Sequence, residues 1–116
     1  MPKAKDEAVQ SVEQLLEALA EARQAIRATE VTLRRALKKV EQGSDVATAI
    51  ATAHPAETRQ LVNDALTAVE QCRHEVRRTV FGAAINEGMS IGDLGRSWGF
   101  SRQMASRYAR ESQGQS

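Results

Sequence analysis

Apolar residues recur at helical spacing over a long N-terminal stretch, about residues 6–42, that contains neither proline nor glycine. One series is spaced by seven residues: Val12, Leu19, Ile26, Leu33 and Val40. A companion series holds Val9, Leu16 and Leu37, with Arg23 and Glu30 at the two remaining positions. Leu15, Ala22 and Ala36 widen this stripe, and the other faces are charged. The pattern predicts one long amphipathic helix of the coiled-coil type.

A helix of this length extends roughly 50 Å and cannot bury such a stripe within its own span, so it needs a partner helix. Arg23 and Glu30 interrupt the stripe. They either set the register of the packing or lie solvated at its edge, and the sequence leaves both readings open.

A second long helix is expected after a short connection. Gly43 ends the first helix, and Ser44 or Asp45 can cap one or two helical turns. His54-Pro55 then interrupts the chain, because proline fits the first turn of a new helix. The second stripe comprises Leu61, Val62, Ala65, Leu66, Val69, Cys72, Val76 and Val80, and the pattern runs on to Gly88. The two long helices should form an antiparallel hairpin.

Two helices with stripes this wide leave apolar surface uncovered when they pair only with each other. A homodimer with a four-helix arrangement would cover that surface. We therefore expect residues 1–75 to be a dimerisation hairpin.

Short elements follow Gly88. Ser90 is an N-cap candidate with Asp93 in capping-box spacing, which predicts a helix over residues 91–98. Gly99 ends it, and Ser101 caps a last helix that runs to about Glu111. The expected organisation is a tri-helical unit over residues 76–112, sharing the end of the second long helix, and a disordered tail over 113–116.

Composition supports an all-α chain with its globular unit at the C-terminal end. Three of the four aromatic residues, Trp98, Phe100 and Tyr108, fall within residues 90–111, and Phe81 lies just before them. Cys72 is the single cysteine, so no intrachain disulfide can form and a reducing cytosol is the expected compartment. No signal-peptide core and no run of eighteen apolar residues occurs, which favours a cytoplasmic protein.

Charge is unevenly distributed although the net charge is only +1. Residues 1–72 hold nine Lys/Arg and eleven Asp/Glu, whereas residues 73–116 hold seven Arg and four Asp/Glu. The C-terminal part is therefore net positive, which supports contact with nucleic acid without proving it.

Residues 90–111 have the residue types that a helix-turn-helix needs. Gly95 supplies the small residue where the second helix crosses the first, and Gly99 supplies positive φ in the turn. The apolar residues that should lock the pair are Ile91, Leu94, Trp98, Phe100, Ala105 and Tyr108, with Val80, Phe81, Ala84 and Ile85 from the preceding helix. The polar outer face carries Arg102, Gln103, Ser106, Arg107 and Arg110.

The run EGMSIGDLGRSWGFSRQ, with the helix that follows, resembles the helix-turn-helix of bacterial DNA-binding proteins. The form is the one shared by sigma-factor region-four-like proteins and related small regulators. The resemblance covers about thirty of the 116 residues. Gly92 departs from the pattern and costs up to ~1 kcal/mol relative to alanine in a helix. Met104 departs too, and either packs inward or touches a thymine methyl group. The hairpin resembles no family.

The resemblance implies that residues 101–111 form a recognition helix in the DNA major groove. Arg102 and Gln103 are the best candidates for base edges, since Arg pairs well with guanine and Gln with adenine. Ser106 and Arg107 reach bases or phosphates. Phosphate contacts are expected from Ser90, Ser101, Arg96 and Arg110, and more weakly from Arg77 and Arg78.

The expected function is sequence-specific binding of double-stranded DNA by a homodimer, as a nucleoid-associated transcriptional regulator. The alternative is a helical adaptor whose hairpin binds a protein partner such as RNA polymerase, with the tri-helical unit used for protein contact. No cofactor, small-molecule substrate, metal site or catalytic group is expected. His54 and His74 belong to no metal-binding cluster, and Cys72 lies on the helix stripe as a small core residue.

Overall fold

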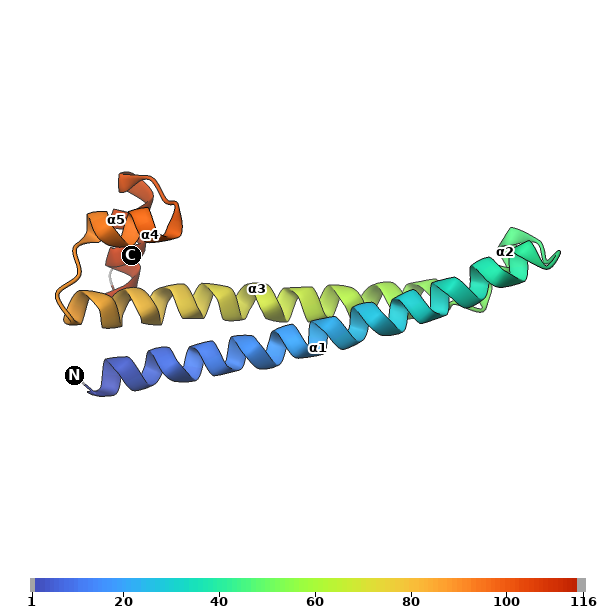
Figure 1. Cartoon of the computed structure of the whole chain (residues 1–116), viewed down its shortest axis with the longest axis horizontal. Helices are drawn as coiled ribbons and strands as arrows, with labels where there is room; N and C mark the ends of the chain where they lie inside the picture. Colours follow the sequence, from blue (N-terminus) through green and yellow to red (C-terminus); the bar gives the residue numbers. More distant parts are fainter. Residues whose placement is uncertain (1, 115–116) are drawn as a thin grey trace. The chain divides into compact units, whose positions relative to one another are not determined.

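The computed structural model describes residues 2–114, and these residues form helices joined by short connections, with no strand among them. The helices are α1 (Pro2–Glu41), α2 (Val46–Ala51), α3 (Pro55–Asn86), α4 (Ile91–Trp98) and α5 (Arg102–Ser112) (Figure 1). The all-α prediction is confirmed. The predicted tail begins with a turn at Gln113 and Gly114, and residues 115–116 lie outside the described part.

The chain divides into two compact units. Unit 1 comprises residues 1–16 and 71–116, and unit 2 comprises residues 17–70. Each long helix therefore contributes one part to each unit.

In unit 2 the chain reverses direction around the short helix α2 (Figure 1). Gly43 has φ +109°, and the N–H groups of Gly43 and Ser44 donate to the carbonyls of Val40 and Lys39, both at 3.0 Å. This pair of bonds is a Schellman motif, which ends α1. Asp45 then caps α2 by accepting a hydrogen bond from the Thr48 N–H at 2.8 Å. Of the two predicted cap candidates, Asp45 is the one used.

Packing inside unit 2 uses small side chains. Ala18, Ala22, Ala25 and Ala36 of α1 are buried, and Thr29 and Thr32 between them are half-buried. The positions alternate three and four residues apart, so they form one continuous face of the helix. On α3, Val62, Ala65 and Val69 are half-buried. A seam of alanines lets a neighbouring helix approach closely.

The large apolar residues of α1 lie on a different face and are exposed. In unit 2, Leu19 is 45 % exposed, Ile26 43 %, Leu33 49 % and Leu37 59 %. In unit 1, Val9, Val12 and Leu16 are exposed as well. The heptad stripe identified in the sequence is thus not where α1 packs within its own chain. The residues that were expected only to widen it, Ala22 and Ala36, belong to the buried seam.

Unit 1 contains an aromatic core. Phe81 is fully buried and packs with Leu94, Tyr108 and Ala109, with Ala84, Ile85 and Phe100 at the edge of the cluster. The Phe81 ring centroid lies 5.5 Å from that of Trp98 and 6.2 Å from that of Tyr108, both edge-on. Aromatic pairs favour this edge-to-face geometry. Among the residues predicted to lock the unit, Ile91 is 39 % exposed, and Trp98 packs against Phe81 although it is 37 % exposed.

Candidate nucleic-acid interface

Helix α4 begins and ends where the sequence places its boundaries. The Ser90 hydroxyl oxygen accepts from the Asp93 N–H at 3.1 Å, which satisfies one free donor of the first turn. At the other end Gly99 adopts φ +72°, and the Phe100 N–H donates to the Gly95 carbonyl at 2.8 Å. The left-handed residue and this hydrogen bond stop the helix and turn the chain toward α5.

Gly95 is the point of closest approach between α4 and α5. A Cβ built at Gly95 would lie 3.0 Å from the Ala105 Cβ and 3.5 Å from the Phe100 carbonyl oxygen. Gly95 and Ala105 are both buried. The expectation that Gly95 supplies a small residue at a close crossing is therefore confirmed. The contact fixes how α5 is held against α4.

Helix α5 begins directly after this crossing. Ser101 is its N-cap, and the Ser101 hydroxyl oxygen accepts from the Met104 N–H at 3.1 Å. Ala105, Tyr108 and Ala109 are buried and anchor one face of the helix. The opposite face is the one predicted from the sequence: Arg102, Gln103, Arg107 and Arg110 are exposed, and Ser106 is half-buried. Met104 is 39 % exposed, so its side chain does not pack fully inward.

The cations near α5 differ in how far they are neutralised. Arg107 lies 4.0 Å from the Glu111 carboxylate, and its guanidinium carbon is 5.3 Å from the centre of the Tyr108 ring. Among the described residues, Arg102, Gln103 and Arg110 make no side-chain hydrogen bond or ion pair. The start of α5 therefore presents a cation and an amide that are both unpaired and solvated.

Arg96, on α4, is already paired. Its guanidinium contacts the Asp93 carboxylate one turn earlier, with both side chains more than half exposed. This hydrogen bond, together with the one from Ser90, lowers the pKa of Asp93. Asp93 thus stays ionised at neutral pH and offsets the charge of Arg96. Of the predicted phosphate contacts on α4 and α5, Arg96 has the closer ion pair, because Arg107 lies 4.0 Å from its carboxylate partner.

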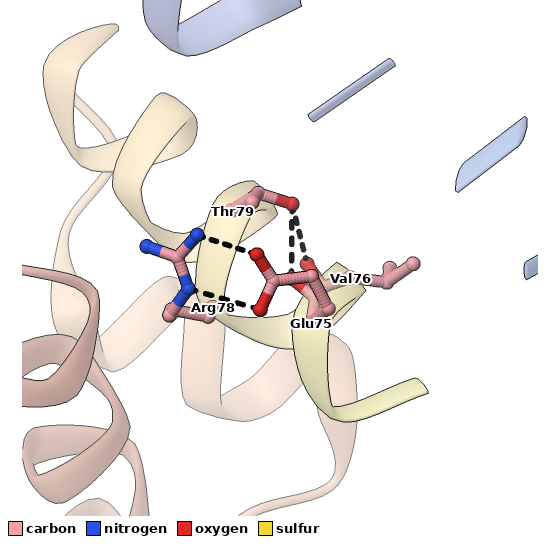
Figure 2. A network of polar contacts seen from close by, with 4 residues as sticks. All are labelled: Glu75, Val76, Arg78 and Thr79. Atoms are coloured by element: carbon pink, nitrogen blue, oxygen red, sulfur yellow. Dashed lines mark hydrogen bonds and ion pairs between the residues drawn. The ribbon is translucent and has the colours of Figure 1, made fainter. Parts of the chain in front are cut away.

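Two arginines of α3 have structural partners that the sequence reading did not assign. The Arg77 guanidinium carbon lies 3.8 Å from the centre of the Tyr108 ring, a cation–π contact, and Arg77 also contacts His74. Arg78 binds the Glu75 carboxylate through two hydrogen bonds of 3.1 and 2.5 Å (Figure 2). The spacing of three residues is the signal that could have revealed the Glu75–Arg78 pair.

The Glu75–Arg78 pair stabilises this part of α3. The Arg78 hydrogen bond lowers the pKa of Glu75, and the same bond raises the pKa of Arg78. Beside it, the Thr79 hydroxyl donates to the Glu75 and Val76 carbonyls at 3.1 and 3.3 Å (Figure 2). Arg78 is engaged with Glu75 on α3, and Arg77 with His74 and the Tyr108 ring, so both are weaker candidates for phosphate contact than Arg102 and Arg110.

A hollow of about 340 Å³ opens between α4 and the first residue of α5. It is lined by Ile91, Gly92, Gly95, Arg96, Phe100 and Arg102. Gly92, which departs from the helix-turn-helix pattern, borders this hollow. A Cβ there would make ordinary contacts with the end of the Arg96 side chain at 3.6 Å and the Ser90 hydroxyl oxygen at 3.9 Å, so Gly92 is not required by packing.

Neither a metal-binding cluster nor a membrane-crossing helix is present in residues 2–114. No three His, Cys, Asp or Glu side chains of this part gather closely enough to hold an ion. Its helices are also too short or too polar to span a bilayer. Cys72 is a free, half-buried cysteine on α3.

No protein-family model matches this chain, and neither a curated protein nor a solved structure matches it. The functional argument therefore rests on the geometry and the charges of the residues described above.

Proposed function

We propose that the chain binds double-stranded DNA sequence-specifically, as a homodimer, with α5 inserted in the major groove. The observation that carries the proposal is the start of α5, where the side chains of Arg102 and Gln103 are exposed and have no partner among residues 2–114. These two side-chain types read guanine and adenine edges through paired hydrogen bonds. Recognition helices of this motif place their N-terminal residues against the bases.

The remaining polar groups of α5 supply affinity rather than sequence preference. The Arg110 side chain is exposed and has no partner within the described part of the chain, and Arg107 lies 4.0 Å from the Glu111 carboxylate. Ser101 and Ser90 accept hydrogen bonds at the two helix starts. The Ser101 hydroxyl can still donate to a phosphate oxygen, whereas the Ser90 hydroxyl already hydrogen-bonds to the Asp93 carboxylate and is the weaker candidate. Contacts of this kind release counterions, so binding should weaken steeply as salt rises.

The homodimer would hold two α5 helices on two half-sites of a palindromic sequence. A protein of this kind acts as a transcriptional regulator and associates with the nucleoid of a bacterial cytoplasm. Neither a cofactor nor a small-molecule substrate enters this mechanism.

Selection of bound duplexes from a random DNA pool tests the proposal. The purified chain should enrich a palindromic motif, and its affinity for that motif should fall by about 10³ or more between 50 and 200 mM salt. A pool that shows no enrichment after repeated rounds contradicts sequence-specific binding. Enrichment of a single, non-palindromic half-site contradicts the homodimer part alone.

A second candidate, a helical adaptor, is favoured by unit 2. Exposed leucines and Ile26 line α1, and an apolar pocket of about 320 Å³ lies among α1, α2 and α3, bordered by Leu33, Ile50 and Val62. Such surfaces fit a protein partner. The adaptor function predicts weak DNA binding without sequence preference, and a partner released by a Leu33→Lys substitution.

A further inference from the structure

Helix α1 carries two distinct faces within unit 2. The buried seam consists of alanines and threonines, as described above. The second face, here called the outer seam, consists of Leu19, Arg23, Ile26, Glu30, Leu33 and Leu37. All six residues are exposed. They alternate three and four residues apart, which is the spacing of a coiled-coil seam.

The two faces point in directions about 100° apart around the helix axis, because successive residues of an α-helix are about 100° apart. Ala18, Ala22 and Ala25 precede Leu19, Arg23 and Ile26 by one residue each. A helix in a four-helix bundle contacts two neighbours at roughly this angle. The alanine seam holds one neighbour in unit 2, and the outer seam is shaped for a second.

We propose that the outer seam binds the outer seam of a second copy of this chain, with the two α1 helices antiparallel. Charge decides the orientation. In a parallel pair with matching register, Arg23 would face Arg23 of the second copy, and Glu30 would face Glu30. Two like-charged layers inside a seam are strongly unfavourable.

The antiparallel arrangement removes both conflicts. Arg23 then faces Ile26 of the second copy, and Glu30 faces Leu19. Glu30 of the second copy is four residues from the Ile26 that faces Arg23, which is about 6 Å along the helix axis. The Arg23 guanidinium can reach the Glu30 carboxylate over this distance. By symmetry this ion pair forms twice. Arg23 and Glu30 therefore act as register-setting residues, which resolves the two readings left open by the sequence.

The side chains are available for this role. Glu30 already binds Arg34 on its own helix at 3.2 Å, but through one carboxylate oxygen, and both side chains are more than half exposed. Exposed pairs of this spacing contribute little, so Glu30 can accept a second cation. In the described part of the chain, Arg23 makes no hydrogen bond or ion pair.

The inference rests on the homodimer part of the proposed function and specifies its geometry. It does not depend on what α5 binds, so it is tested without DNA. Failure of the dimer and failure of DNA recognition therefore remain separate results.

Charge reversal provides the first test. Arg23→Glu and Glu30→Arg each place like charges together in the antiparallel register, and each should raise the dimer dissociation constant about tenfold or more. The double reversal restores opposite charges and should return the constant to within a few-fold of the original chain. Sedimentation velocity measures the constants, and circular dichroism verifies that every variant is folded. A double variant no better than the single variants overturns the proposal.

Distance measurement provides the second test. A Lys38→Cys substitution in a Cys72→Ala background places one spin label at an exposed position of each chain. Electron paramagnetic resonance then measures the distance between the two labels of a dimer. In the antiparallel register, residue 38 lies opposite residue 11 of the second copy. The two labels are then about 27 residues apart along the helix axis, which is about 40 Å at about 1.5 Å per residue. Labels within about 20 Å indicate a parallel pair and overturn the orientation. A chain that stays monomeric at all concentrations overturns the proposal altogether.

Discussion

Residues 76–112 and unit 2 solve the packing problem in opposite ways. In the first region the aromatic side chain of Phe81 is completely buried, and Trp98, Phe100 and Tyr108 pack around it. In unit 2 the buried side chains of α1 are alanines, while the leucines and Ile26 are exposed. The first region is stabilised by its own side chains. Unit 2 leaves its largest apolar groups free for another surface.

This difference fits the two tasks of the proposed function. A recognition helix must be held rigidly so that its outer side chains keep a fixed geometry, and a small aromatic core provides that rigidity. A dimerisation helix must keep apolar area for a second chain, and close alanine packing lets the hairpin form without using that area. The following predictions test the contrast, starting with the largest expected effect.

Removing the central ring should unfold the C-terminal region. Phe81→Ala deletes a fully buried aromatic side chain, and such deletions cost about 3–5 kcal/mol of unfolding free energy. Chemical denaturation followed by circular dichroism measures the loss. Trp98→Ala is the matched control, because Trp98 is 37 % exposed and its removal should cost clearly less. Equal losses for the two variants would contradict the assignment of Phe81 as the centre of the core.

Enlarging the alanine seam should destabilise unit 2. Ala22→Leu forces a larger side chain into a buried position, and overpacking of this kind costs about 1–3 kcal/mol. Ala28→Leu makes the same chemical change at an exposed position of the same helix and should be nearly neutral. Thermal unfolding of the two variants compares them directly. A neutral Ala22→Leu would show that the alanine face does not pack closely.

The two glycines of α4 should respond differently to alanine. Gly92→Ala removes a helix-disfavouring residue and makes only ordinary contacts, with the Arg96 and Ser90 side chains, so it should stabilise by up to ~1 kcal/mol. Gly95→Ala places a Cβ 3.0 Å from the Ala105 Cβ, so overpacking should cancel or reverse the same gain. Denaturation midpoints measure both changes. A gain at Gly95 equal to that at Gly92 would contradict the close crossing.

The smallest effect concerns pH. The pKa of Glu75 is lowered by the Arg78 hydrogen bond, so the pair stabilises the fold above the ordinary carboxyl pKa of about 4.3 and loses that contribution as pH falls below it. Because both side chains are 42 % exposed, screening keeps the contribution below about 1 kcal/mol. Glu75→Gln and Arg78→Gln should therefore each destabilise at pH 7. As pH falls through the lowered pKa of Glu75, the stability difference between the Glu75→Gln variant and the original chain should narrow, and an unchanged difference would contradict the ion pair.

Much of the fold could be predicted from sequence because its boundaries are local. Ser90, Gly99 and Ser101 stop or start helices through backbone groups one turn away, so their identities and spacing suffice. Gly95 was recognised for the same reason, since the short turn forces α4 and α5 to cross near it.

The packing of α1 could not be predicted in this way. Hydrophobicity indicated the stripe that includes Leu19 and Ile26, but the helix packs in unit 2 through Ala18, Ala22 and Ala25. Both faces have the same helical period, and only the partner helix decides which face is covered. The pairing of Arg77 with the Tyr108 ring was missed because it depends on how two helices meet.

The central claim is that the start of α5 reads base edges, and one comparison tests it most directly. DNA sites are selected from a random pool by the original chain and by a Gln103→Ala variant. The two selected motifs are then compared. The account predicts that the variant loses preference at one base pair of each half-site, by about 1–3 kcal/mol, while the other positions keep theirs. An unchanged motif, or a uniform loss at every position, would contradict it.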